Sequence, residues 1–279
     1  MPDSGSFRHN GHSIAYDVDG EGDRTLILIH GLLMNRRMFD RLAPEMASRR
    51  YRVVTIDLLG HGRSDRPVDR RLYSMTAFAD QVAALADHLE LDRPVVGGTS
   101  LGANVSIELG ARHPDKARGL VIEMPVLENA LLFVAAAFTP MLVLLRFGSP
   151  LLRWLSAIAN RIPRSSYLLD IGLDWIRQDP HPSRAVLEGL FFGRVAPPRE
   201  ERQTIDVPAM VIGHPADPLH PFSDADMLVE ELREARLVDA SSIFEWRLNP
   251  GRLNDELTTF LDEVYSAPEP ARRLRVANA

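Results

Sequence analysis

The stretch VVGGTSLGAN, residues 95–104, places a serine where a nucleophile could stand. An apolar run typical of a buried strand leads into Gly98, and a pattern typical of a helix follows Gly102. Ser100 then falls in a sharp strand-to-helix turn, with a glycine two positions away on each side to give clearance. This spacing predicts that Ser100 is a nucleophile. The alternative is a tight turn without a chemical role.

Two backbone amides are placed to stabilise the oxyanion that attack by Ser100 would form. One belongs to Leu101, the residue after the serine. The other belongs to Leu32, in the stretch LILIHGLLMN, where an apolar strand ends at His30 and Gly31. We expect His30 itself to brace this loop, because an imidazole at the end of a buried strand more often forms structural hydrogen bonds than transfers protons.

Strand-like and helix-like segments alternate along the chain, which predicts an α/β fold with a mostly parallel, doubly wound sheet. Between about 126 and 204 there are helical stretches but no convincing strand, so we predict a helical insertion there and a core made of residues 1–125 and 205–266. The tail, 267–279, has little to bury, and we expect it to be disordered. The expected strands are 12–18, 24–31, 52–57, 93–100, 118–124, 207–213 and 235–240; the expected helices are 36–49, 74–91, 101–113, 222–234 and 251–264.

Five blocks in order resemble those of the α/β-hydrolase fold superfamily: HGLLMNRRMFD, YRVVTIDLLGHGRSD, VVGGTSLGAN, ARHPDKARGLVIEMP and VPAMVIGHPADPLHP. The resemblance implies acyl transfer by a serine, a histidine base and an aspartate, with an oxyanion hole. It also implies that the insertion is a cap over the active site. It places the acid at Asp217, for which the alternative is a turn before Pro218. Residues 57–65, DLLGHGRSD, correspond to a structural loop at the pocket rim.

The chain departs from this family where the histidine is expected. That position falls among residues 241–243 of VDASSIFEWRLNP, which are Ser, Ser and Ile. The best replacement is His220, three residues beyond Asp217 at the same edge of the sheet. If one strand separates it from Ser100, as in the family's strand order, the strand ends lie roughly 10 Å apart. Glu245, His181, and a water-assisted or substrate-assisted route remain open as alternatives.

Composition excludes several classes of function. The formal charge is −6, and no basic block is dense enough for nucleic acid. There is no cysteine and a single lysine, Lys116, so a thiol nucleophile and a Schiff-base lysine have almost no candidate. No metal-ligand spacing or nucleotide motif is evident, and we expect neither a metal nor a cofactor. No secretory signal is visible, so we expect a cytoplasmic protein.

The insertion holds an uncharged run, residues 130–145, that is shorter than the roughly 20 residues of a bilayer span and contains Pro140. We therefore interpret it as core or pocket-facing helix and do not expect membrane contact. The apolar residues singled out as pocket or cap core are Leu131, Phe133, Phe138, Leu144, Trp154 and Phe191.

The sequence thus predicts a carboxylesterase-like serine hydrolase for a hydrophobic small-molecule ester, thioester or lactone, with a non-standard or weakened general base. The rival hypothesis is a non-hydrolytic protein of the same fold, acting in ligand binding, cyclase-like chemistry or as a scaffold, that has lost the triad histidine. The sequence leaves the oligomeric state open.

Overall fold

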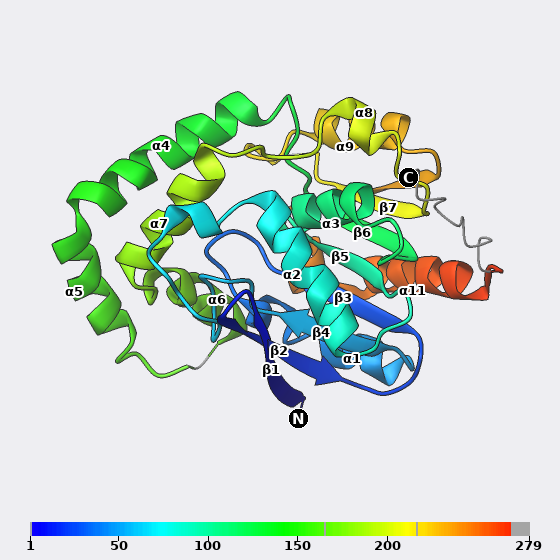
Figure 1. Ribbon diagram of the computed structural model, residues 1–279, viewed down its shortest axis with the longest axis horizontal. Coiled ribbons are helices and arrows are strands. Elements are labelled where there is room, and N and C mark those ends of the chain that lie inside the picture. Colours follow the sequence, from blue (N-terminus) through cyan, green and yellow to red (C-terminus); the bar gives the residue numbers. More distant parts are fainter. Residues whose placement is uncertain (1, 165, 216, 269–279) are drawn as a thin grey trace, which may run out of the picture.

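An eight-stranded sheet forms the centre of the computed structural model, which describes residues 2–164, 166–215 and 217–268 (Figure 1). Its strand order is β1-β2-β4-β3-β5-β6-β7-β8. The first two pairings, β1 with β2 and β2 with β4, are antiparallel, and every later pairing is parallel. This sheet confirms the predicted mostly parallel α/β class. The strands are β1 Asp3–His9, β2 His12–Asp19, β3 Thr25–Ile29, β4 Arg52–Ile56, β5 Val95–Thr99, β6 Gly119–Glu123, β7 Ala209–Gly213 and β8 Ala235–Asp239.

The helices lie on both faces of the sheet and in the segment between β6 and β7. The core helices are α1 Leu42–Ser48, α2 Met75–His88, α3 Leu101–Arg112, α9 Phe222–Glu231, α10 Glu245–Leu248 and α11 Gly251–Ser266, with short 3-10 helices at Arg36–Phe39 and Arg70–Leu72. The helices between β6 and β7 are α4 Leu131–Phe147, α5 Ser149–Ala159, α6 Tyr167–Ile176, α7 Pro180–Phe191 and α8 Arg199–Arg202.

Strand β3 shows why a continuous apolar run forms a central strand. All five of its residues are buried. Ile27 and Ile29 join the cluster that includes α2 and α3, whereas Leu26 and Leu28 join the cluster that includes α1 and α11. Because successive side chains of a strand point to opposite faces, a strand covered by helices on both sides needs apolar residues at every position.

The predicted strands are present with ends within two residues of those expected. Two details differ. The first strand, β1, is not among the expected strands, and the predicted helix 36–49 is divided into a 3-10 turn and α1. Between β6 and β7 the described residues contain helices and no strand, as expected for the insertion that we call the cap (126–204). From residue 269 onward the predicted disordered tail lies outside the described residues.

Two buried polar groups fix the ends of the cap to the core. The carboxylate of Asp224, in α9, accepts hydrogen bonds from the amides of Leu127, Asn129 and Ala130, where α4 begins. At the other end, the guanidinium of Arg202 is 1% exposed and pairs with Glu231 of α9 and with Glu128. Helix α9 therefore anchors both ends of the cap.

We predict that Asp224→Ala lowers the free energy of unfolding by about 2–4 kcal/mol, because three buried amides lose their acceptor together. Urea unfolding monitored by tryptophan fluorescence measures the change. Asp226→Ala is the matched control, since Asp226 lies on the same helix but is exposed. Equal effects of the two substitutions would contradict the anchoring role.

Candidate active site

Ser100 occupies the strained turn that its flanking glycines predict. Its backbone has φ 55° and ψ −109°, which is a costly conformation for a residue with a side chain. The turn lies directly between β5 and α3. A Cβ on either Gly98 or Gly102 would overlap the carbonyl oxygen of Ile29, at the end of β3. Only glycine at these two positions lets the turn approach the neighbouring strand so closely.

The structure brings Ser100, His220 and Asp217 together in one chain of hydrogen bonds. Nε2 of His220 lies 2.9 Å from Oγ of Ser100, and Nδ1 lies 2.7 Å from Oδ2 of Asp217. Both distances are normal for hydrogen bonds. The side chains of His220 and Asp217 are 14% and 7% exposed. As expected, a single strand, β6, separates β5 from β7, which precedes the loop that carries both residues.

Asp217 also organises the loop that carries the histidine. Its Oδ1 accepts hydrogen bonds from the amides of Leu219 and His220, at 2.8 and 3.1 Å. Both interpretations of Asp217 therefore apply. Its Oδ1 forms the turn, and its Oδ2 pairs with the imidazole. Burial would raise the pKa of Asp217, but the hydrogen bonds from His220 and its charge outweigh burial and lower that pKa.

The amides of Leu32 and Leu101 lie beside the serine with their donors free. Neither donates a backbone hydrogen bond to another group in the described part of the chain. Leu101 is the first residue of α3, so its N–H has no acceptor within the helix. Both residues line the same cavity as Ser100 and His220. Two free donors beside a serine hydroxyl suit the stabilisation of an oxyanion.

The cavity measures about 430 Å³ and lies between the serine turn and the cap. Its walls are mostly apolar, with Ser100, His220, Thr99 and Asn104 as the polar members. The cap contributes a stripe of α4 residues and the end of α7: Leu131, Val134, Ala135, Phe138, Leu187, Leu190 and Phe191. A site of this size and character holds a small hydrophobic molecule.

Comparison with known proteins agrees with this geometry. A family model described as alpha/beta hydrolase fold matches residues 24–152. An AB hydrolase superfamily protein of Bacillus subtilis is 27% identical over 234 residues, which are 77% of this chain and 82% of that protein. The chain therefore has the α/β-hydrolase fold. The resemblance found in the sequence is therefore confirmed.

Two further relatives carry names that describe a reaction. A pimeloyl-[acyl-carrier protein] methyl ester esterase of Neisseria meningitidis serogroup B is 41% identical over 100 residues, 36% of this chain and 35% of that protein. The crystal structure of the enol-lactonase from Burkholderia xenovorans LB400 has a TM-score of 0.73 at 22% identity, covering 94% of this chain and 100% of that one. The hydrolase family thus includes esterase and lactonase neighbours of this protein.

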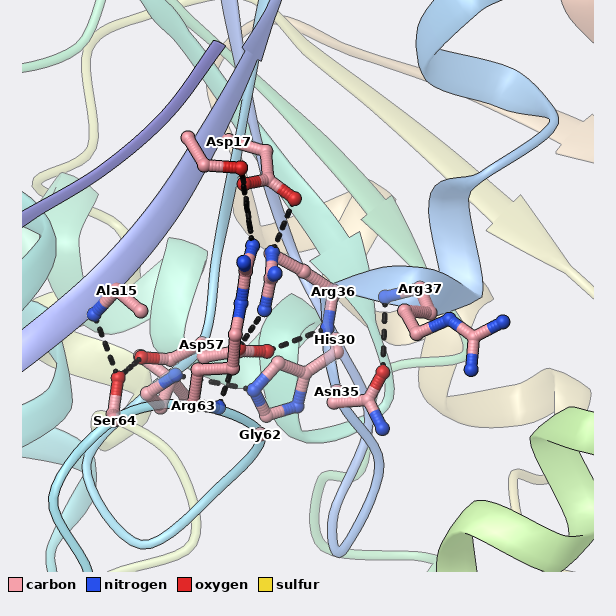
Figure 2. A network of polar contacts seen from close by, with 12 residues as sticks. Ala15, Asp17, His30, Asn35, Arg36, Arg37, Asp57, Gly62, Arg63 and Ser64 are labelled. Carbon is pink, nitrogen blue, oxygen red and sulfur yellow. Dashed lines mark hydrogen bonds and ion pairs between the residues drawn. The ribbon is translucent and has the colours of Figure 1, made fainter. Parts of the chain in front are cut away.

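A buried network of ion pairs and hydrogen bonds holds the loop after β3, which carries Leu32 (Figure 2). The carboxylate of Asp57 accepts hydrogen bonds from the amides of Arg36 and Arg63, both at 2.8 Å, and pairs with the guanidinium of Arg36. Arg36 also contacts Asp17, with Nε 2.5 Å from Oδ2. Asp57 is fully buried and joins the loop after β4 to the loop after β3. Its role is structural, as the sequence predicted for residues 57–65.

The two histidines nearest this network already have hydrogen-bond partners. Nδ1 of His30 lies 2.8 Å from the carbonyl oxygen of Gly31, and its Nε2 accepts a hydrogen bond from the amide of Leu58 at 3.1 Å. Burial lowers the pKa of His30 and, with the neighbouring His30 ring, holds that of His61 well below its ordinary value. His30 therefore braces the loop as a neutral imidazole, in agreement with the sequence analysis.

The alternative bases lie elsewhere. His181 is exposed near the start of α7 and does not line the cavity. Glu245 pairs with Arg252 and accepts a hydrogen bond from the amide of Ser241, and these contacts, led by Arg252, lower its pKa to about 2. Neither residue contacts Ser100 in the described structure, so His220 alone among these candidates reaches the hydroxyl.

Sequence reasoning missed a buried ion cluster under the serine turn. Glu123, the last residue of β6, is 1% exposed and pairs with Arg247 at 2.7 Å, and its carboxylate also accepts a hydrogen bond from the hydroxyl of Thr99. Burial would raise the pKa of Glu123, but Arg247 and, to a smaller extent, His214 lower it to about 2. An acidic residue ending a buried parallel strand was the signal available, because such a charge requires a partner.

The cluster also contacts the segment where the family's histidine is expected. Nδ1 of His214 donates a hydrogen bond to the carbonyl oxygen of Ser242, at 3.0 Å, and Nε2 lies 3.4 Å from Glu123. Ser242 belongs to the segment where the family's histidine was expected. The backbone carbonyl oxygen of Glu123 in turn accepts a hydrogen bond from the amide of Ser100, at 2.8 Å. The cluster thus joins the vacated loop to the serine turn.

None of the six apolar residues singled out as pocket or cap core is buried, and three of them do not line the cavity. Phe133, Leu144 and Trp154 are 56%, 43% and 60% exposed, and none of them lines the cavity. The other three, Leu131, Phe138 and Phe191, do line it. The correction follows from the arrangement of the cap, because α4 and α5 lie along its outer edge with one face uncovered (Figure 1).

We predict that Arg247→Met lowers the free energy of unfolding by about 3–5 kcal/mol at neutral pH, since it leaves a buried carboxylate without its main counter-ion. Ionised Glu123 stabilises the fold above the ordinary carboxyl range, and this contribution is lost as the pH falls toward its pKa of about 2. The substitution raises that pKa, so the deficit should narrow between pH 7 and pH 3.

Denaturant unfolding at several pH values measures this deficit. The control is Arg233→Met, which removes a surface pair with Asp206 whose side chains are 58% and 54% exposed. It should have a much smaller effect. A deficit for Arg247→Met that stays constant with pH would show that lost packing, and not the charge of Glu123, is responsible.

Proposed function

We propose that this protein is a serine hydrolase in which Ser100 is the nucleophile, His220 the general base and Asp217 the acid that orients it. The observation that carries the proposal is the chain of hydrogen bonds from Asp217 through His220 to Ser100, at 2.7 and 2.9 Å, opening into an apolar cavity. The strained backbone of Ser100 supports it, because such strain persists where function requires it.

In the proposed mechanism, Nε2 of His220 accepts the hydroxyl proton as Oγ of Ser100 attacks the acyl carbon. The carbonyl electrons move to oxygen, and the amides of Leu32 and Leu101 stabilise the resulting negative charge. Asp217 holds the imidazole in the required tautomer and stabilises the imidazolium. His220 then donates its proton to the leaving oxygen or sulfur, and a water molecule, activated in the same way, hydrolyses the acyl-enzyme.

The substrate that the cavity fits is a small hydrophobic ester, thioester or lactone. The apolar wall supports the word hydrophobic, and the esterase and the enol-lactonase among the compared proteins support an acyl-oxygen bond. The three substrate types share one acyl-enzyme intermediate and so make the same demands on the triad. A cofactor is not part of this mechanism.

The rival proposal, a non-hydrolytic binding protein of this fold, rested on the absence of a histidine after β8. The hydrogen bond between His220 and Ser100 argues against this rival, because it offers a base from the loop after β7. The two proposals differ in one observable property. A hydrolase requires an activated Ser100, whereas a ligand-binding protein does not.

We expect a fluorophosphonate probe to label the wild-type protein at Ser100 and short p-nitrophenyl esters to be hydrolysed. Ser100→Ala should abolish labelling, and Ser100→Ala and His220→Ala should each reduce turnover by roughly 10⁵–10⁶. His181→Ala serves as the control, because its exposed ring is remote from the cavity, and should behave as wild type. Unchanged turnover in Ser100→Ala would reject the proposal. Loss in Ser100→Ala with full activity in His220→Ala would reject the base.

Asp217→Asn should lower kcat by roughly 10⁴, because the amide favours the wrong tautomer of His220. The pH profile of kcat/KM should fall on the acidic side, because a general base must be unprotonated to accept the serine proton. Since hydrogen bonding to His220 lowers the pKa of Asp217, that carboxylate stays ionised across this fall. A profile with no acidic limb in the wild type would contradict a histidine base.

A further inference from the structure

Helix α5 turns its large apolar side chains outward. Leu151, Trp154, Leu155 and Ile158 follow the spacing i, i+3, i+4 and i+7, which marks the buried stripe of an ordinary amphipathic helix. Here they are 54%, 60%, 37% and 38% exposed. The small residues Ser149, Ser156 and Ala159 face the protein instead and are buried. The helix therefore presents to its surroundings the face that normally packs on a core.

Helix α4 extends this apolar surface. Leu132, Phe133 and Phe147 are 83%, 56% and 75% exposed. We call the surface made by Leu132, Phe133, Phe147, Leu151, Trp154 and Ile158 the outer cap face. Figure 1 shows α4 and α5 along the outer edge of the cap, away from the sheet. Soluble monomers seldom expose so many large apolar side chains together, and such a patch indicates a binding partner.

The charge around the outer cap face indicates which kind of partner it binds. Residues 129–169 carry four arginines, at 146, 153, 161 and 164, and no Asp or Glu, although the whole chain has a formal charge of −6. Arg146 and Arg164 pair with Glu188 of α7 and Asp174 of α6, whereas Arg153 and Arg161 are exposed. An apolar helix face with a tryptophan and flanking arginines is typical of segments that lie in the headgroup region of a membrane. The local positive charge favours anionic lipids.

Length distinguishes binding to a membrane surface from spanning the bilayer. Among the described residues, no single helix is long and apolar enough to cross a bilayer. Only α4 and α5 together pass that test, and the pair is bent by 94°. A bent pair with its apolar side chains on one outer face suits a position in the plane of the interface.

We propose that the outer cap face docks on the surface of an anionic lipid bilayer. This departs from the expectation from the sequence, which took Phe133 and Trp154 of this face for pocket or cap core and did not expect membrane contact. The proposal is continuous with the cavity, because Leu131, Val134 and Phe138 on the inner side of α4 line it. A docked cap would place one helix between the lipid and the cavity, so that a hydrophobic molecule has a short path from the membrane.

Flotation with lipid vesicles tests the proposal, and it does not require enzymatic activity. Wild-type protein should float with vesicles of phosphatidylcholine containing phosphatidylglycerol, and less with phosphatidylcholine alone or at high salt. Leu151→Asp should weaken the partition roughly tenfold or more. Leu248→Asp is the matched control, since Leu248 is 55% exposed against 54% for Leu151 but lies in α10, outside the cap; it should float as wild type.

Two further variants separate the contributions. Arg153→Gln with Arg161→Gln should abolish the preference for anionic vesicles, and Ser100→Ala should float as wild type, so that failure of docking and failure of the hydrolase proposal are distinguishable. Absence of flotation, or an equal loss in Leu151→Asp and Leu248→Asp, would overturn the proposal. A second copy of the chain is the competing occupant. A wild-type dimer that Leu151→Asp dissociates, without vesicle binding, would assign the face to self-association and overturn docking.

Discussion

The hydrogen bond from the Ser100 hydroxyl to the His220 ring is the contact on which the other features of the site depend. Because His220 and Asp217 are three residues apart, one short loop after β7 must hold both the proposed base and the acid that orients it. A shift of that loop would displace both groups at once. The contacts that fix it are therefore part of the site: the Asx turn at Asp217, the hydrogen bond from the Asp217 amide to the carbonyl of His214, and the start of α9 directly after Pro221.

Placing the histidine on this loop frees the segment after β8 for another use. That segment forms α10, and Arg247 from it reaches the buried carboxylate of Glu123. Glu123 needs such a partner, since a buried carboxylate without one would be protonated or would destabilise the fold. The backbone carbonyl oxygen of Glu123 also accepts a hydrogen bond from the Ser100 amide. The segment after β8 thus holds Glu123, which binds the serine turn, while the loop after β7 carries the imidazole that reaches Ser100.

The sequence predicted those features that depend on local spacing and failed on those that depend on what covers a surface. The strand-to-helix turn at Ser100 follows from its glycines, and the reach of His220 follows from strand order and strand spacing. The pairing of Glu123 with Arg247 joins residues 124 apart, which no local pattern records. Trp154 illustrates the second failure. Its helical periodicity predicts an apolar face, but periodicity is identical whether that face packs on a core, a lipid or another chain, so only the structure showed it uncovered.

Helix α9 connects the core of the molecule to the cap. It begins one residue after the proline that follows His220, and its Asp224 and Glu231 hold the two ends of the cap. These anchors fix the first turn of α4 close to the core, whereas α5 meets other parts of the cap and not the sheet. The fixed end of α4 lines the cavity near Ser100, and its far end, at Phe147, lies in the outer cap face. Helix α4 therefore joins the outer cap face to the cavity wall, and the loop that carries His220 leads directly into the helix that anchors the cap.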